Sequence, residues 1–259
     1  MDNYDFAILS LQGLLVCAAY LLGGTVDAVC GGGGLLTVPA LLSTGMPAHM
    51  VVGTNLMAAV PGCGMALYKY SRSGNVDYQA GWMSVPFIVI GAFLGTRLNL
   101  VMSDRFLQLL MLFLVPVLAA VTFIQKNSSE EDSSSAPSGR RKFFGVAAVT
   151  LLVSTYHAFY GPASGTFYMI FFAMVLKCGM VKGNGLARFV LLWANLLAGI
   201  LYARSGFMCW EAIVPTCACY IAGNYMGASI AVTKGARFVR PVYYCVLALL
   251  FAKLVADFF

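Results

Sequence analysis

Charged residues and histidine are scarce in this sequence, and their scarcity excludes several classes of protein. Only 10% of the 259 residues are charged and 60% are hydrophobic, whereas about 25% of residues are charged in an ordinary soluble domain. There are two histidines, and the H-E-x-x-H, G-x-S-x-G and P-loop motifs are all missing. The sequence therefore indicates neither an enzyme nor an ATP-driven transporter.

The cysteines and the net charge indicate no cofactor and no nucleic acid. Eight cysteines are present, nearly all within apolar segments and without a C-x-x-C pair, which is typical of small packing residues. We therefore expect no metal and no cofactor. The net charge of +6 would suit a nucleic-acid partner, but the cations form no run, so no such partner is expected.

Long apolar runs occupy most of the chain. A helix needs about 20 apolar residues to cross a bilayer core of about 30 Å. The sequence therefore predicts an all-α polytopic membrane protein. Two shorter segments, 35–43 and 166–176, either cross fully, which gives ten crossings, or re-enter, which leaves eight. The long runs are residues 6–28, 51–70, 78–98, 106–124, 143–160, 186–202, 212–232 and 242–255.

The lysines and arginines predict the topology. In the ten-crossing arrangement most of the 16 lie on one side of the membrane, and the positive-inside rule makes that side cytoplasmic. Both termini are then extracytoplasmic. The polar, serine-rich stretch 127–142 is predicted to be a flexible cytoplasmic linker between two membrane units, residues 1–126 and 143–259.

The two membrane units are related in sequence. At a shift of 132 residues, Arg72-Ser73-Gly74 aligns with Arg204-Ser205-Gly206, and Arg105-Phe106 aligns with Arg237-Phe238. Five segments per unit, an odd number, would insert the second unit with opposite polarity, whereas four would make the repeats parallel. Inverted repeats are a common construction of secondary transporters, with the substrate site at the repeat interface. The sequence thus predicts two inverted repeats of about five segments each.

Glycines interrupt a predicted helix in each unit. Four glycines occupy positions 31–34, and each costs a helix about 1 kcal/mol relative to alanine. Such a break at membrane depth is tolerated inside protein or beside a watery cavity, where the restarting helix points free N–H groups at an anion. Close helix packing is the alternative. The second unit repeats the break at 160–166, where Gly165 aligns with Gly33, so glycine-broken helices are expected at the repeat interface.

Several motifs resemble those of one known family. Residues 33–39 match a G-G-x-x-x-x-P motif, residues 53–55 match a G-T-N segment, and residues 159–162 match an F-Y-G-P break; the turn at 73–78 and the loop at 235–241 are also similar. In these motifs the chain resembles the TauE/SafE sulfite exporter family, also called the toluene-sulfonate uptake permease family. The resemblance implies a multi-pass carrier of the bacterial plasma (inner) membrane for sulfite, sulfonates or related sulfur oxyanions.

The chain departs from the family pattern near the expected site. The family often has lysine after G-T-N, where this chain has Leu56, and the repeat partner of Leu56 is Arg188. There the family tends to have lysine, followed by asparagine three and seven residues later. Leu191 replaces the first asparagine and Asn195 matches the second. One of two symmetric cations is lost, which implies a substrate of lower charge or a changed coupling.

The polar residues around the two breaks are the predicted substrate site. Arg188 would hold an oxyanion with its two-pronged guanidinium, or else be an interfacial arginine that reaches the headgroups. Asp27 and His157 are candidate proton carriers; a helix cap and a buried neutral histidine are the alternatives. The residues predicted to bind substrate are Gly33, Gly34, Thr54, Asn55, Tyr160, Ser164, Gly165, Arg188 and Asn195.

The sequence thus predicts a secondary transporter that exports a small sulfur-containing anion by alternating access, driven by an ion gradient or the membrane potential. Two alternatives stay open: an anion channel without alternating access, and an uptake carrier for a small carboxylate. The expected partners are the anionic substrate and the lipid bilayer, with the protein a monomer or a homodimer.

Overall fold

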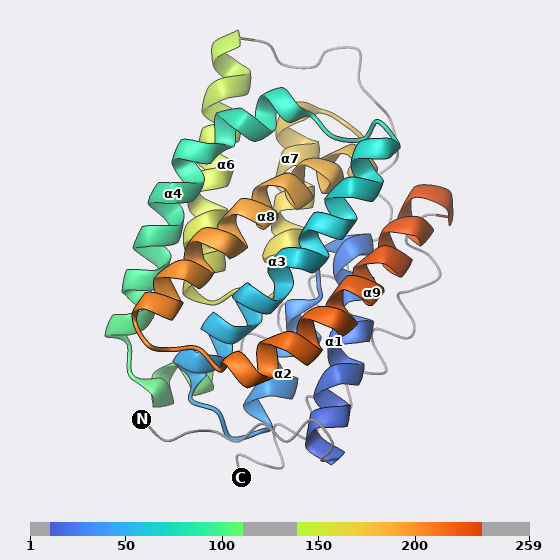
Figure 1. Cartoon of the computed structure of the whole chain (residues 1–259). Coiled ribbons are helices and arrows are strands. Elements are labelled where there is room, and N and C mark those ends of the chain that lie inside the picture. Colours follow the sequence, from blue (N-terminus) through green and yellow to red (C-terminus); the bar gives the residue numbers. More distant parts are fainter. Residues whose placement is uncertain (1–10, 111–138, 235–259) are drawn as a thin grey trace.

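The computed structural model describes residues 11–110 and 139–234, and within these ranges the chain forms helices and no strands (Figure 1). The helices are nearly uniformly apolar, as in a chain whose helices face either one another or lipid. They are α1 (Leu11–Cys30), α2 (Gly34–Leu42), α3 (Ala48–Arg72), α4 (Tyr78–Val101), α6 (Gly139–Phe159), α7 (Ser164–Leu176), α8 (Met180–Arg204) and α9 (Trp210–Lys234).

Within the described ranges, five helices are long and apolar enough to cross a membrane: α1, α3, α4, α6 and α8. Large apolar side chains such as Trp82, Phe93 and Leu152 stay exposed on their outer faces, where a bilayer would cover them. The long helices and these faces agree with the prediction of an all-α polytopic membrane protein.

The helices extend slightly beyond the apolar runs that predicted them. The run 51–70 lies within α3, 78–98 within α4, 186–202 within α8 and 212–232 within α9. The short segments became α2 and α7. The longer of these, α7, has 13 residues and is about 20 Å long, so each of the two helices is shorter than a bilayer core of about 30 Å.

Parts of the sequence-based prediction lie outside the described residues. These are the start of the run 6–28, the end of the run 106–124, the run 242–255 and the loop 235–241. Of the predicted linker 127–142, residues 139–142 belong to α6 and the remainder lies outside the described residues.

An ion pair joins the start of α4 to the start of α6. Asp77 caps α4 by accepting a hydrogen bond from the Ala80 N–H at 2.9 Å, and Lys142 Nζ lies 2.8 Å from its carboxylate. Burial raises the pKa of Asp77, but the hydrogen bonds from Lys142 and the Ala80 N–H lower it by more, so the pKa lies below its usual value.

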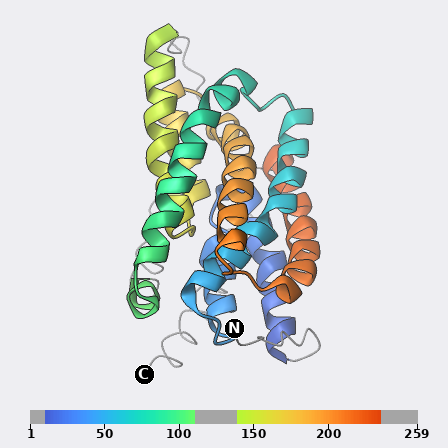
Figure 2. The same cartoon turned by 60° about the vertical axis from the view of Figure 1, so that its left-hand side comes forward.

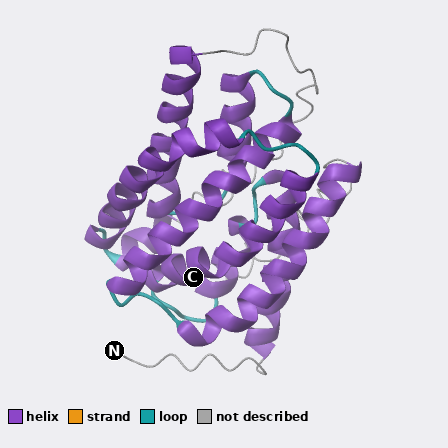
Figure 3. Ribbon diagram, turned by 45° about the horizontal axis from the view of Figure 1, so that its top comes forward, coloured by secondary structure: helices purple, strands orange, loops and turns teal. Residues whose placement is uncertain are grey.

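The long helices pack in pairs that combine the two halves of the chain. α1 lies along α9, and α6 lies along α4, while α3 and α8 cross between these pairs and run in opposite directions (Figures 1 and 2). Glycines allow the close approach. A methyl group on Gly227 would lie 2.1 Å from the Thr25 carbonyl oxygen of α1, and one on Gly95 would lie 2.2 Å from that of Thr155 of α6. Most of the described loops lie at the two ends of the bundle (Figure 3).

Candidate anion site

A glycine turn separates α1 from α2 inside the bundle. α1 ends at Cys30 and α2 begins at Gly34. Gly31 adopts a φ of +79°, in the left-handed region that favours glycine, and its N–H donates to the Asp27 carbonyl at 2.7 Å. The helix ends here without further turns of its own, so the carbonyls of residues 28–30 need partners from other parts of the chain.

A second turn separates α6 from α7. α6 ends at Phe159 and α7 begins at Ser164, with Gly161 at φ +97° and Ala163 at φ +61°. A left-handed φ is uncommon for a residue with a side chain and is held only where the surrounding structure fixes it. The chain therefore turns sharply between α6 and α7.

The two turns contact each other. Thr166 donates its backbone N–H to the Gly31 carbonyl at 3.2 Å and its hydroxyl to the Cys30 carbonyl at 2.7 Å. A methyl group on Gly31 would lie 2.1 Å from the carbonyl carbon of Gly165, so no larger residue fits between them. Two segments more than a hundred residues apart in the sequence thus form one backbone crossing.

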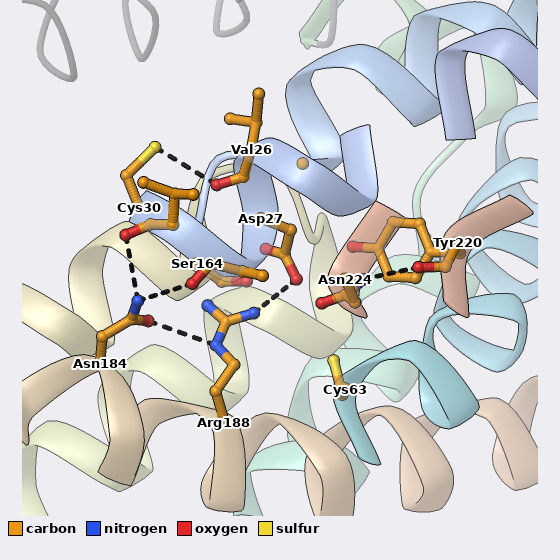
Figure 4. A network of polar contacts seen from close by, with 12 residues as sticks. Val26, Asp27, Cys30, Cys63, Ser164, Asn184, Arg188, Tyr220 and Asn224 are labelled. Carbon is orange, nitrogen blue, oxygen red and sulfur yellow. Dashed lines mark hydrogen bonds and ion pairs between the residues drawn. The ribbon is translucent and has the colours of Figure 1, made fainter. Parts of the chain in front are cut away.

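A buried ion pair lies beside this crossing. Arg188 of α8 donates from Nη1 to Asp27 Oδ2 of α1 at 2.5 Å, and the arginine is fully buried (Figure 4). The Nη2 atom of Arg188 is buried and has no hydrogen-bond partner among the described residues. It lies close to Gly165, where an added methyl group would be 2.9 Å from Nη2. The arginine does not extend to the headgroups; it points into the protein.

Asn184 fixes both the arginine and the end of α1. Its Oδ1 accepts from Arg188 Nε at 3.2 Å, while its Nδ2 lies 2.9 Å from the Ala28 carbonyl and 3.1 Å from the Val29 carbonyl. Nδ2 also lies 2.7 Å from the Tyr70 hydroxyl, which donates to the same Ala28 carbonyl at 2.8 Å. Asn184 was not among the site residues predicted from the sequence. The available signal was an amide one helical turn before a membrane arginine.

A small polar cavity of about 30 Å³ lies between the ion pair and the two turns. It brings together six of the residues that were singled out from the sequence and adds residues that were not. The lining residues from the sequence-based set are Asp27, Gly34, Asn55, His157, Ser164 and Asn195, and the others include Cys63, Leu191 and Tyr220.

Hydrogen bonds link the polar residues of this lining. His157 Nδ1 lies 2.6 Å from Ser164 Oγ, and Nε2 lies 3.1 Å from Asn195 Oδ1. Asn195 in turn donates to Cys63 Sγ at 3.4 Å. The Asn55 Oδ1 accepts from the Tyr20 hydroxyl at 3.0 Å. The imidazole therefore connects the second turn with α8, and both of its nitrogens have a partner.

The other predicted binding residues do not line the cavity. Thr54 accepts a hydrogen bond from the Cys209 backbone N–H at 3.0 Å and so joins α3 to the start of α9. Tyr160 is fully buried beside the ring of Tyr156. Gly33 packs against the carbonyl of Gly23, as Gly165 does against Gly31.

The chemistry of the site suits an anion better than a metal ion. No group of three or more His, Cys, Asp or Glu side chains lies close enough to hold a metal among residues 11–110 and 139–234. The polar groups that line the cavity are two amides, an imidazole, two hydroxyls and the Asp27 carboxylate. Arg188 does not itself line the cavity; it pairs with Asp27, and its Nη2 has no hydrogen-bond partner among the described residues, so it can contact an oxygen atom.

The chain is similar to known membrane transporters. A family model described as "Sulfite exporter TauE/SafE" matches residues 16–254 of the chain. The chain is 27% identical to "Probable membrane transporter protein ORF9" of Sinorhizobium sp. over 98% of its own length and 95% of that protein. It is 28% identical to a "Probable membrane transporter protein" of Haemophilus influenzae, with 96% of each chain covered.

A third relative, "Probable membrane transporter protein YfcA" of Escherichia coli K12, is 26% identical over 95% of this chain and 90% of its own. No solved structure matches the chain. Because the family model covers nearly the whole chain, and because the relatives match it from end to end, the chain belongs to the sulfite exporter TauE/SafE family of membrane transporters.

Proposed function

We propose that this protein is a secondary transporter that exports a small sulfur-containing anion, such as sulfite or a sulfonate, by alternating access between two inverted repeats. The observation that carries the proposal is the buried Arg188–Asp27 pair with its unpartnered Nη2 atom beside the two helix turns. A planar cation with spare donors matches the several oxygens of a sulfur oxyanion, and a bidentate contact would fix the orientation of that anion.

The packing of the helices supports the inverted repeats. α1 lies along α9 and its repeat counterpart α6 lies along α4, so each half supplies the partner of the other half's first helix. Tyr70 and Tyr202, partners at the shift of 132 residues, each donate to a carbonyl near the end of the first helix of their own half, that of Ala28 in α1 and that of Ala158 in α6. The counterparts α3 and α8 run in opposite directions (Figure 1).

The size of the cavity favours a carrier over an open channel. On this measure a water molecule needs about 10–15 Å³, so the cavity of about 30 Å³ holds two or three waters. A sulfonate has more heavy atoms than that, and no hydrated anion fits. The cavity is therefore too small for the substrate in this conformation and has to widen to take one up, as a conformational cycle of alternating access provides.

The ion pair also provides a mechanism for coupling transport to protons. A bound oxyanion competes with the Asp27 carboxylate for the guanidinium of Arg188. Once Asp27 loses this partner, its carboxylate is an uncompensated buried charge, which is unfavourable. Asp27 is the first candidate for a coupled proton. A monovalent anion and one proton that cross together carry no net charge, so the direction of net transport follows the sum of the anion and proton gradients. His157 faces the same cavity and is the second candidate for the proton.

The test is anion exchange in liposomes that contain the purified protein. We expect saturable efflux of labelled sulfite or a small sulfonate that unlabelled anion on the far side accelerates. Arg188→Gln should abolish it. Asp27→Asn should keep the exchange but lose net transport driven by a pH gradient. Arg72→Gln is the matched control, since Arg72 is an exposed helix-end arginine.

Two results would contradict the proposal. A current that rises linearly with the anion gradient, without acceleration by anion on the far side, would identify a channel. Transport of acetate or another small carboxylate in preference to every sulfur anion would identify the carboxylate carrier.

A further inference from the structure

A second pocket opens on the membrane-facing surface between the last turns of α4 and α8. Its volume is about 370 Å³, more than ten times that of the cavity beside Arg188, and it is lined by Phe93, Thr96, Arg97, Leu201 and Arg204 among others. Both helices end here, α4 at Val101 and α8 at Arg204, so the pocket lies at one end of the bundle, where a bilayer has its headgroups.

The pocket combines two cations with an apolar wall. Arg97 and Arg204 are exposed, and the ion pairs of the described part of the chain, Lys142–Asp77 and Arg188–Asp27, include neither of them. The guanidinium of Arg97 lies 5.1 Å from the ring centre of Phe93, which fixes the arginine on the pocket wall. Phe93 and Val101 are 48% and 80% exposed, so the wall continues onto the lipid-facing surface.

A buried hydroxyl without a partner also lines this pocket. Thr96 is 2% exposed, and its Oγ1 has no hydrogen-bond partner among the described residues. A buried hydroxyl without a hydrogen bond is unfavourable, and most helical threonines avoid this by bonding to a carbonyl of the preceding turn. The Thr96 hydroxyl is thus available to an oxygen atom that enters the pocket.

We propose that this pocket binds the phosphate headgroup of an anionic phospholipid. The phosphate lies between Arg97 and Arg204, an ester or glycerol oxygen contacts the Thr96 hydroxyl, and an acyl chain runs along Phe93 and Val101. Charge selects the headgroup, since two unpaired cations attract an anionic lipid and gain little from a zwitterionic one. The site is separate from the proposed anion path, so its test does not depend on the transport proposal.

The test is native mass spectrometry of the purified protein in neutral detergent, with phosphatidylglycerol and phosphatidylcholine of identical acyl chains. We expect tighter binding of phosphatidylglycerol. Arg97→Gln or Arg204→Gln alone should weaken it about fivefold, and the double variant about 25-fold. Replacement of both arginines by lysine should keep most of the preference.

Two variants separate the pocket from general surface charge. Arg72→Gln, at the repeat position that matches Arg204, should leave the lipid affinity unchanged. Thr96→Val should weaken phosphatidylglycerol binding roughly fivefold while leaving the stability of the lipid-free protein unchanged or higher, because the lost hydroxyl has no hydrogen-bond partner in the described part of the chain.

Three outcomes would overturn the proposal. The first is equal affinity for the two lipids, or phosphatidylglycerol binding that survives the double glutamine variant. The second is competition by glycerol phosphate as strong as that by the lipid, which would identify a site for a free phosphate ester. The third is a dimer that dissociates in the double variant without any effect of lipid, which would identify a second copy of this chain as the occupant.

Discussion

Removing the charge of Arg188 or of Asp27, one at a time, should show how much each charge depends on the other for its stability inside the protein. Both side chains are nearly or fully buried, with 0% and 8% of their side-chain surface exposed. Removal of one partner from a buried pair leaves an uncompensated charge and costs about 3–5 kcal/mol. We therefore expect Arg188→Gln and Asp27→Asn each to lower the free energy of unfolding by about this amount.

The double variant distinguishes an ion pair from two independent polar residues. With both charges removed, no unpaired ion stays buried. The loss of stability in the double variant should therefore be smaller than the sum of the two single losses by at least about 2 kcal/mol. The measurement is denaturation in mixed detergent micelles, followed by tryptophan fluorescence and circular dichroism. Losses that add to within about 0.5 kcal/mol would refute the reasoning, because independent sites behave in that way.

Ligand binding provides a second measurement, which a purely structural role of the ion pair would leave unchanged. Asp27→Asn removes the carboxylate that competes for the guanidinium, so this variant should bind sulfite or a sulfonate at least as tightly as the unchanged protein. Arg188→Gln should bind neither. Equal affinity in all the variants, measured by calorimetry, would show that the anion binds elsewhere.

Three further predictions concern the glycine contact at the turns, the role of Asn184 and the ion pair of Asp77. Gly31→Ala should lower the free energy of unfolding by more than about 3 kcal/mol in denaturation experiments, because the added methyl group collides with Gly165. Gly45→Ala is the control: its φ is +82° but open space surrounds it, so the loss should be about 1–2 kcal/mol. Equal losses in the two variants would contradict the close contact between Gly31 and Gly165. Asn184→Leu should reduce the affinity for the anion about tenfold and lower the free energy of unfolding by about 2 kcal/mol, because Arg188 Nε and the carbonyls at the end of α1 lose a hydrogen-bond partner. Calorimetry measures the affinity and denaturation measures the stability. An unchanged affinity would exclude a positioning role for Asn184. The pKa of Asp77 is lower in the folded protein than in the unfolded chain, so the ionised carboxylate stabilises the fold above the unfolded-state pKa of about 4, and this stabilisation is lost as the pH falls through the lower folded-state pKa. Melting curves recorded against pH should show this loss for the unchanged protein and not for Asp77→Asn. The same loss in Asp77→Asn would assign it to another carboxylate.

The helices and their approximate limits followed from the sequence because membrane helices are specified by local composition. A run of about 20 apolar residues satisfies its own backbone hydrogen bonds and needs no distant partner to be recognised. The signal was weaker for α2 and α7, whose 9 and 13 residues are too few to decide whether a segment crosses the membrane.

The candidate site could be predicted only in part. Glycine runs and isolated polar residues in apolar segments pointed to Asp27, Arg188 and Asn195, since each is unfavourable in a membrane without a specific partner. Thr54 is different: it belongs to a motif, but its hydroxyl accepts a hydrogen bond from the backbone N–H of Cys209, just before α9, a contact that only the packing of α3 against α9 creates. Asn184 was missed for the converse reason, because it belongs to no motif and acts through tertiary contacts.

The sequence by itself determined that the chain is a set of apolar helices, that it breaks near residues 31 and 161, and that a charge of each sign lies beside membrane-buried segments. These are properties of single segments, set by hydrophobicity and backbone propensity. Only the tertiary structure decided that Arg188 points inward to Asp27 and that the two turns meet at Gly31 and Gly165. The reason is physical: a partner 161 residues away is chosen by how helices pack, and that choice leaves no trace in the local pattern around either residue.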